Sequence, residues 1–186
     1  MLLLFKNEGI RMKALIAYGT RYGSTTDIAN KMGEILTEEG IDVKIVNLAE
    51  EKIDDVSNYD LIIIGSSIKI GSWTKKSLEF LERFESDLSK KKTAFFVSCL
   101  DANDPKKCKE ARENYLEKVA KKYPSIRPYK LGLFGGVIDM KKYGFGTKLM
   151  VKALSKNLEK QGIDINKSND FRNWEEIQNW TREVLI

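Results

Sequence analysis

The sequence predicts an α/β fold, a doubly wound sandwich whose five-stranded parallel sheet, in the order 2-1-3-4-5, carries helices on both faces. Two observations lead to this class. Short apolar runs typical of buried strands alternate along the chain with segments of helical periodicity. Polar stretches with glycine follow several of these runs, and in open parallel sheets ligands bind outside the carboxyl ends of the strands.

The expected strands and helices alternate in a regular order. Strands are expected at residues 13–18, 43–46, 61–64, 93–97 and about 129–138. Helices are expected at residues 26–39, 75–84, about 105–122 and 174–185. The first helix has Ile28 and Met32 on one face and ends at Gly40. The last opens with Asn173 and Glu176 at the spacing of a capping box, so a long insertion separates it from the fifth strand.

The length and composition suit a single domain. The chain has 186 residues, of which 42% are hydrophobic. We expect an N-terminal extension without assigned function at residues 1–11 and one folded domain at residues 12–186. No apolar run approaches the roughly 20 residues that span a bilayer, and the apolar start at residues 1–5 is too short for a secretory signal. The expected location is the cytoplasm.

The composition excludes several kinds of catalysis. Histidine is absent, and the cysteines are Cys99 and Cys108, with no C-x-x-C pair. Zinc and iron–sulfur sites are therefore not expected. Nucleophilic catalysis that depends on histidine is excluded. We nominate no catalytic side chain and expect a bound cofactor to carry the chemistry.

The turn after the first strand has the character of an anion site. The apolar run to Tyr18 ends in hydroxyl and glycine residues before the helix opens. Gly23 lets the backbone approach a ligand, and the N–H groups and dipole at a helix start favour a phosphate. Thr20, Ser24 and Thr25 add hydroxyl groups without charge, whereas the lysine of a nucleoside triphosphate loop is missing. The alternative is that these residues only turn the chain and cap the helix.

Polar stretches also follow the third and fourth strands, at residues 65–73 and 98–103. In the order 2-1-3-4-5 these loops and the first meet at one edge of the sheet. The three loops resemble those that contact FMN in flavodoxins, and the chain resembles that family from residue 13 onward. More narrowly, the run from Thr20 to Thr25, a lysine and a glycine in the second loop, and the long insertion before Trp174 are similar to the menaquinone-linked protoporphyrinogen oxidase branch.

The resemblance implies FMN as the cofactor and assigns the residues that contact it. In the first loop they are Thr20, Arg21, Tyr22, Gly23, Ser24 and Thr25. In the second loop they are Ser66, Ser67, Ile68, Lys69, Ile70, Gly71 and Trp73. In the third loop they are Ser98, Cys99, Leu100, Asp101 and Asn103.

Some of these residues have a second interpretation. Trp73 offers a flat apolar face on which flavin can stack, or it leads into the next helix and packs in the core. Asp101 and Asn103 contact the flavin, or they only form the turn before the helix near Pro105. Lys69, if it points inward, stabilises the reduced flavin anion by about 1 to 4 kcal/mol at about 4 Å and raises the redox potential.

Basic charge separates this chain from the acidic electron carriers that the resemblance brings to mind. Lysine and arginine total 32 against 27 acidic residues, a net charge of +5. Within the insertion, lysines recur every fourth residue beside apolar positions, as on an amphipathic helix. These lysines are Lys148, Lys152, Lys156 and Lys160. The alternatives are a solvated face whose apolar side packs on the sheet, and a platform for anionic lipid or a substrate with carboxylates.

The resulting hypothesis is an FMN-binding redox protein. Its specific form is a flavoprotein of the protoporphyrinogen oxidase type, which oxidises an organic substrate and passes the electrons to a quinone. An anionic porphyrin suits a basic and apolar surface. Peripheral contact with an anionic membrane through the Lys148 to Lys160 helix is a further expectation, and nucleic acid is not expected because no such motif accompanies the charge. The alternative is a soluble electron carrier without its own substrate.

Overall fold

A five-stranded parallel sheet in the order β2-β1-β3-β4-β5 forms the centre of the molecule, as predicted. The computed structural model describes residues 11–153, 155–160 and 162–186, so the predicted extension at residues 1–11 lies, apart from Arg11, outside the described residues. The strands are β1 Lys13–Gly19, β2 Asp42–Asn47, β3 Leu61–Ser67, β4 Lys92–Ser98 and β5 Lys130–Phe134. The doubly wound α/β class is confirmed.

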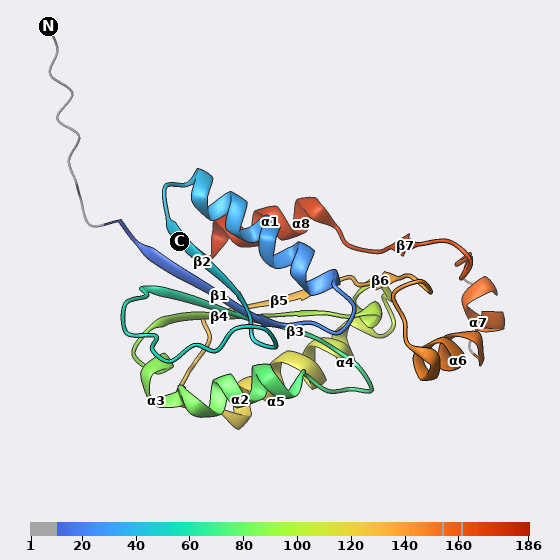
Figure 1. Cartoon of the computed structure of the whole chain (residues 1–186), viewed down its shortest axis with the longest axis horizontal. Helices are drawn as coiled ribbons and strands as arrows, with labels where there is room; N and C mark the ends of the chain where they lie inside the picture. Colours follow the sequence, from blue (N-terminus) through green and yellow to red (C-terminus); the bar gives the residue numbers. More distant parts are fainter. Residues whose placement is uncertain (1–10, 154, 161) are drawn as a thin grey trace, which may run out of the picture.

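Helices cover both faces of this sheet (Figure 1). On one face lie α1 Ser24–Glu38 and α8 Trp174–Glu183, and on the other α2 Lys75–Arg83, α3 Glu85–Leu88, α4 Cys108–Arg112 and α5 Lys118–Lys122. A 3₁₀ turn, η1 Leu100–Asn103, follows β4, and a π-helical turn, η2 Glu113–Glu117, joins α4 to α5. The helix predicted at 105–122 begins later, at Cys108, because the Asp104 carboxylate accepts the Lys106 N–H at 2.9 Å and holds a turn there.

The central strands are buried on both faces, which explains why they read as continuous apolar runs. Alternate side chains divide the core: Leu15 and Phe95 pack toward α2, whereas Ile16 and Phe96 pack toward α1 and α8. These side chains have no exposed surface. No helix within the described ranges has the length and apolar character that crossing a bilayer requires.

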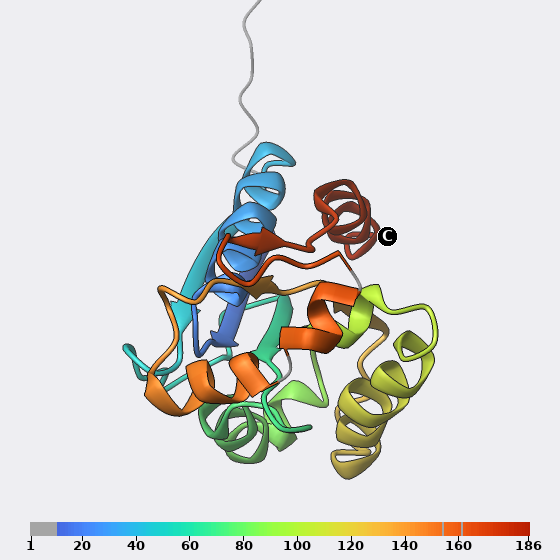
Figure 2. The same ribbon diagram turned by 90° about the vertical axis from the view of Figure 1, so that its right-hand side faces the viewer.

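The strand predicted at 129–138 is wrong in its second half. β5 ends at Phe134, and β6 Val137–Ile138 pairs with β7 Asn169–Asp170 in a separate antiparallel sheet. Gly135 marks the break, because a side-chain carbon there would lie only 2.0 Å from the Phe171 carbonyl oxygen of the returning chain. The insertion that starts here lies beyond the carboxyl ends of the strands (Figures 1 and 2).

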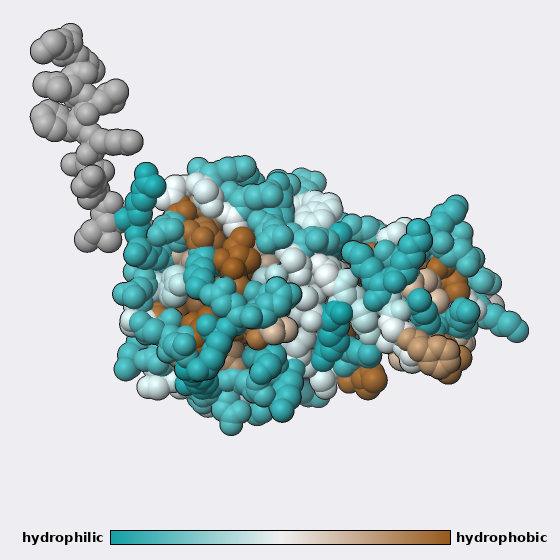
Figure 3. All heavy atoms as spheres, in the orientation of Figure 1, coloured by the Kyte–Doolittle hydropathy of each residue, from teal (hydrophilic) through white to brown (hydrophobic). Residues whose placement is uncertain are grey.

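The lysine-rich part of the insertion is helical over α6 Phe145–Ala153 and α7 Ser155–Lys160, and residue 154 between them lies outside the described residues. Of the two alternatives for this segment, packing of the apolar side on the sheet is contradicted, because Phe145 is 85% exposed and Leu149 is 61% exposed. Figure 3 shows hydrophobic atoms at the surface over α6. The physical reason is position, because α6 lies past the end of the sheet. The insertion has its own small core instead, made of Ile138, Tyr143, Val151 and Ile165.

Candidate functional site

The first loop has the features of a phosphate site. Gly23 ends it with φ 93° and precedes α1 without a side-chain cap, which leaves the first N–H groups of the helix for a ligand. The Thr20 hydroxyl accepts the Gly23 N–H at 3.0 Å and shapes the turn. Thr25 is fully buried, and its Oγ1 has no hydrogen-bond partner within the described part of the chain. An orphaned buried hydroxyl at an uncapped helix start fits the phosphate of FMN.

The three predicted loops meet at one edge, as expected. The register pairs Gly19 with Ser66 and Ser67 with Ser98, so β1, β3 and β4 end level with one another. The Ser98 hydroxyl lies 3.3 Å from that of Ser24 in the first loop, and the Ser98 carbonyl accepts the Ile68 N–H at 3.1 Å. The third loop therefore touches both of the others.

Arg21 joins the first loop to the second through hydrogen bonds to backbone carbonyls. Its guanidinium donates to the Ser67 carbonyl at 2.8 Å and to the Trp73 carbonyl at 3.0 Å, with a longer contact to the Ser72 carbonyl at 3.4 Å. Burial lowers the pKa of Arg21, and the nearby Tyr22 offsets part of this effect. Arg21 thus holds both ends of the second loop, and its assignment as a cofactor contact stays a prediction.

The tip of the second loop is a tight and strained turn. Lys69 and Ser72 exchange backbone hydrogen bonds of 3.1 and 3.2 Å across Ile70 and Gly71. Ile70 has φ 49° and Gly71 has φ 72°. A β-branched residue rarely adopts a positive φ, so the turn is held by its surroundings at a cost of about 1 to 3 kcal/mol. The Ile70 side chain is 83% exposed, so the strain presents an apolar group to the solvent side of the loop.

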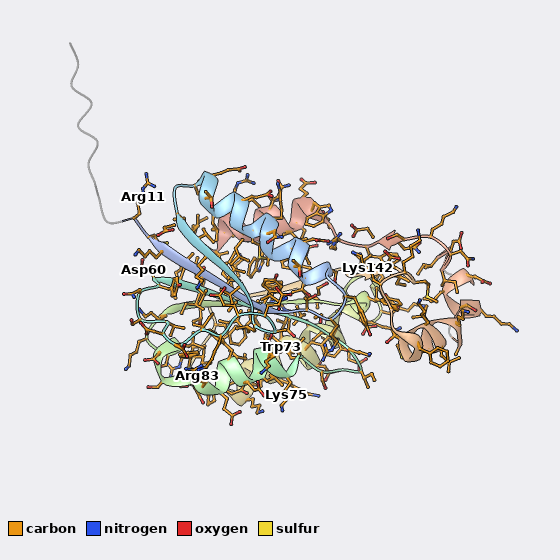
Figure 4. The ribbon with its side chains drawn as sticks, viewed as in Figure 1. Arg11, Asp60, Trp73, Lys75, Arg83 and Lys142 are labelled. Carbon is orange, nitrogen blue, oxygen red and sulfur yellow. The ribbon has the colours of Figure 1, made fainter. Side chains whose placement is uncertain are left out.

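Trp73 is a core residue, and the stacking interpretation is wrong for it. Its side chain is 3% exposed and packs edge-on against Phe95, with ring centroids 5.8 Å apart. The indole N–H donates to the Tyr115 carbonyl at 2.5 Å. Figure 4 shows Trp73 between the sheet and the layer of α2, a place set by the helix that follows it. Its flat face is therefore covered by protein.

Most of the third loop serves structure. The Cys99 thiol is buried, which raises its pKa to about 12, and the Cys99 N–H donates to the Phe134 carbonyl. Asp101 accepts the Tyr115 hydroxyl at 3.1 Å, and Asn103 donates to the Phe171 carbonyl at 2.7 Å. These contacts favour the turn-forming interpretation of Asp101 and Asn103, and the assignment of Cys99 as a cofactor contact stays a prediction. Leu100, 43% exposed, and Asn103 are the exposed side chains of the third loop.

A polar cluster, which we call the clasp, fastens the insertion to the first two loops. It consists of Tyr22, Lys69 and Thr147. The Tyr22 hydroxyl lies 2.6 Å from Thr147 Oγ1, and Lys69 Nζ donates to Tyr22 at 2.8 Å and to Thr147 at 3.0 Å. Lys69, whose effect on the flavin was predicted only for an inward direction, has its ammonium group engaged in the clasp. Tyr143 packs edge-on against the Tyr22 ring, with centroids 4.7 Å apart.

The clasp changes the acidity of Tyr22. Burial raises the pKa of its phenol, but the hydrogen bonds from Lys69 and Thr147 and the charges of Lys69 and Arg21 outweigh this effect. The pKa of Tyr22 therefore lies below the ordinary value for tyrosine. The phenol is poised to give up its proton more readily than in an unfolded chain.

Arg172 is a second residue that fastens the insertion to the rest of the domain, and it was not among the residues predicted from the sequence. Its side chain is 8% exposed and donates to the Asp27 carboxylate at 2.7 Å, to that of Asp170 at 2.6 Å, and to the Ser24 carbonyl at 3.3 Å. It also lies over the Trp174 ring at 4.5 Å. The return of the insertion is thus fixed to the start of α1 across 148 residues of sequence. No local pattern in the sequence relates Arg172 to Asp27, because the two residues lie far apart along the chain.

Comparison with known proteins shows the family of this chain. Residues 15–163 match the family described as the flavodoxin domain, and the chain belongs to that family. It is 28% identical over 173 residues to the protoporphyrinogen IX dehydrogenase (quinone) of Escherichia coli K12, which covers 93% of this chain and 94% of that protein. Among solved structures, the flavodoxin of Streptococcus pneumonia TIGR4 has a TM-score of 0.52 at 14% identity, with 93% and 97% of the two chains covered.

The family supplies the cofactor and the general chemistry. The predicted resemblance to flavodoxins, and within them to the protoporphyrinogen oxidase branch, is confirmed. FMN is the cofactor, and the function is of the FMN-dependent redox type. The residues present fit this group, because the uncapped α1 and the orphaned Thr25 hydroxyl provide a phosphate site without a metal.

Proposed function

We propose that this protein is an FMN-dependent oxidoreductase that oxidises an organic substrate of the protoporphyrinogen type and passes the electrons to a quinone. The observation that carries the proposal is the similarity to the Escherichia coli enzyme, since it extends over 93% of this chain and therefore includes the insertion as well as the sheet. When bound, FMN supplies the ring that takes up and releases the electrons.

The residues of this chain divide the remaining work. In this proposal the first loop holds the phosphate through Thr25 and the start of α1, and Arg21 keeps the second loop in shape. The chain offers no histidine for proton transfer. Beside the loops, exposed apolar side chains alternate with lysines on α6 and suit a substrate that is apolar and anionic. The exposed apolar residues there are Phe145, Leu149 and Met150.

The second candidate is an electron carrier without its own substrate, which is favoured by the similarity to solved flavodoxins. Steady-state oxidation of protoporphyrinogen by the purified FMN-loaded protein, with a menaquinone analogue as acceptor, separates the two. Turnover with both reactants supports the enzyme. Cycling with a flavodoxin reductase but no oxidation of protoporphyrinogen supports the carrier.

The same α6 surface supports the proposed contact with anionic membrane. Lys148 and Lys152 lie on α6 with the exposed apolar residues, and Lys156 lies on α7. Each lysine near an anionic surface contributes about 1 kcal/mol. We predict that replacing all three by Gln lowers binding to phosphatidylserine vesicles by about 3 kcal/mol at low salt, leaving FMN affinity unchanged. The side chain of Lys160 lies outside the described residues.

A matched control removes the same charge elsewhere. Lys90, Lys109 and Lys121 are exposed on the opposite helical layer, and their replacement by Gln changes the net charge equally. Equal losses of vesicle binding in the two triple variants would reduce the effect to net charge. An unchanged vesicle affinity in the variant of Lys148, Lys152 and Lys156 would contradict the membrane contact. The oxidoreductase proposal would still be tested by its own assay.

A further inference from the structure

The insertion places an ammonium group beside the phosphate loop. Lys142 Nζ lies 3.9 Å from the point that a side-chain carbon of residue 23 would occupy, next to the start of α1. Figure 4 shows Lys142 at that end of α1, on the chain that follows β6. Gly23 is therefore approached from its open side by a cation that comes from more than 100 residues further along the chain.

The position of this cation favours an anion beside it. The start of α1 carries a positive partial charge, and its N–H groups have no side-chain cap. Lys142 forms no ion pair within 4.0 Å in the described part of the chain. The nearby Asp170 carboxylate is engaged by Arg172 at 2.6 Å. A cation and a helix start with the same sign of charge are both stabilised by one anion placed between them.

The other cations at this end have partners of their own. The Arg21 guanidinium binds the carbonyls of the second loop, and Lys69 donates to two hydroxyl groups in the clasp. Arg172 is neutralised by Asp27 and Asp170. Lys142 is exposed and has no such partner among the described residues, so it is the charge that remains for a ligand.

We infer that Lys142 binds the phosphate of FMN, so that the insertion supplies the countercharge that the first loop lacks. The first loop itself offers hydroxyl and N–H groups to the phosphate, and the insertion adds an ammonium group. FMN binding and docking of the insertion are then coupled. This inference rests on the proposed assignment of the phosphate to the first loop.

The test compares Lys142→Gln with Lys141→Gln by titrating quenching of flavin fluorescence with FMN and with riboflavin. Lys141 is the adjacent exposed lysine and gives a matched loss of charge. We expect Lys142→Gln to weaken FMN about tenfold, equivalent to about 1.4 kcal/mol, and to leave riboflavin unchanged. FMN affinity should also become less sensitive to salt. Lys142→Arg should retain FMN affinity, and Lys141→Gln should alter neither ligand.

A second readout addresses the phosphate directly. The second pKa of a phosphate monoester lies near about 6, and a neighbouring ammonium favours its dianion. Phosphorus NMR titration of bound FMN should therefore show a higher phosphate pKa in Lys142→Gln than in the unaltered protein. An unchanged FMN affinity and an unchanged phosphate pKa would overturn the inference, as would equal losses for FMN and riboflavin.

Failure of this inference can be told apart from failure of the phosphate assignment. Thr25→Val removes a hydroxyl that belongs to the first loop alone. Loss of FMN affinity in Thr25→Val but not in Lys142→Gln would leave the phosphate in the first loop and reject Lys142. No selective loss in either variant would reject the assignment itself.

Discussion

The sheet and the insertion are held together in different ways. The sheet has two extensive apolar clusters, one on each face, and its central side chains are fully buried. Among its described residues the insertion has four buried apolar residues of its own, and it is attached to the loops by the polar clasp and by Arg172. The loops that we propose to bind the cofactor are thus positioned by a deep core, whereas the surface beside them is positioned by a few side chains. The stability of the sheet and that of the insertion can therefore be probed by separate mutations.

The largest expected effect contrasts the two cores. Phe96→Ala removes a fully buried ring from the sheet and should lower the free energy of unfolding by about 3 to 5 kcal/mol. Val151→Ala, in the core of the insertion, should barely change the global transition in urea but should open the insertion to limited proteolysis. If Val151→Ala lowers global stability as much as Phe96→Ala, the insertion is part of the same cooperative unit.

The next effect concerns the orphaned hydroxyl of the first loop. Thr25→Val keeps the shape of the side chain and removes Oγ1, so FMN should lose about 1.5 to 3 kcal/mol of binding while riboflavin loses far less. The cofactor-free protein should be as stable as before or more so, because an unpaired buried group is removed. Thr25→Ser serves as the control that retains the hydroxyl. A drop in stability without any change in FMN affinity would make Thr25 purely structural.

A smaller effect is expected at the joint between the first two loops. Arg21→Met removes the donors to the Ser67 and Trp73 carbonyls. The free energy of binding of FMN and of riboflavin should each become less favourable by about 1 to 2 kcal/mol. Because Arg21 binds carbonyls of the second loop, we expect the affinities for FMN and for riboflavin to fall equally in fluorescence titrations. A selective loss of FMN would restore Arg21 as a phosphate ligand.

The smallest effect is a pH dependence of the clasp. The pKa of Tyr22 is lowered in the folded protein, so this group stabilises the fold fully above the ordinary pKa of tyrosine, about 10, and that contribution is lost as pH falls through the folded value. Absorbance difference titration of the unaltered protein against Tyr22→Phe should show tyrosinate forming at a lower pH than for an ordinary tyrosine. Burial raises the pKa of Tyr143 and raises that of Tyr115 to about 12, so neither obscures this signal.

Removing the cation tests the cause of that shift. Lys69→Gln takes away the main charge beside the phenol, so the pKa of Tyr22 should move back toward the ordinary value of a tyrosine. The same titration should show no change in Lys75→Gln, where an exposed lysine of α2 is replaced. An unmoved titration in Lys69→Gln would mean that the clasp does not govern this group.

Local patterns were enough to predict the architecture. The apolar runs at Leu61 and Thr93, the helical spacing after Gly23 and the polar stretches at the strand ends predicted the sheet order and the meeting of three loops. The Asn173 cap was also predictable, and its side chain accepts the Glu176 N–H at 3.1 Å. These features follow from the period of side chains along a strand or helix and from backbone groups that need a partner within a few residues.

The use of individual side chains was decided by tertiary structure alone. Tyr22 and Thr147 are separated by 125 residues, and no local pattern relates them. Trp73 became a core residue because α2 begins directly after it and carries it under the sheet, and Lys69 turned to the clasp because the insertion brings two hydroxyl groups within its reach. Sequence periodicity determines which elements form and which face they bury, whereas the partner of a polar side chain depends on where distant segments of the chain meet.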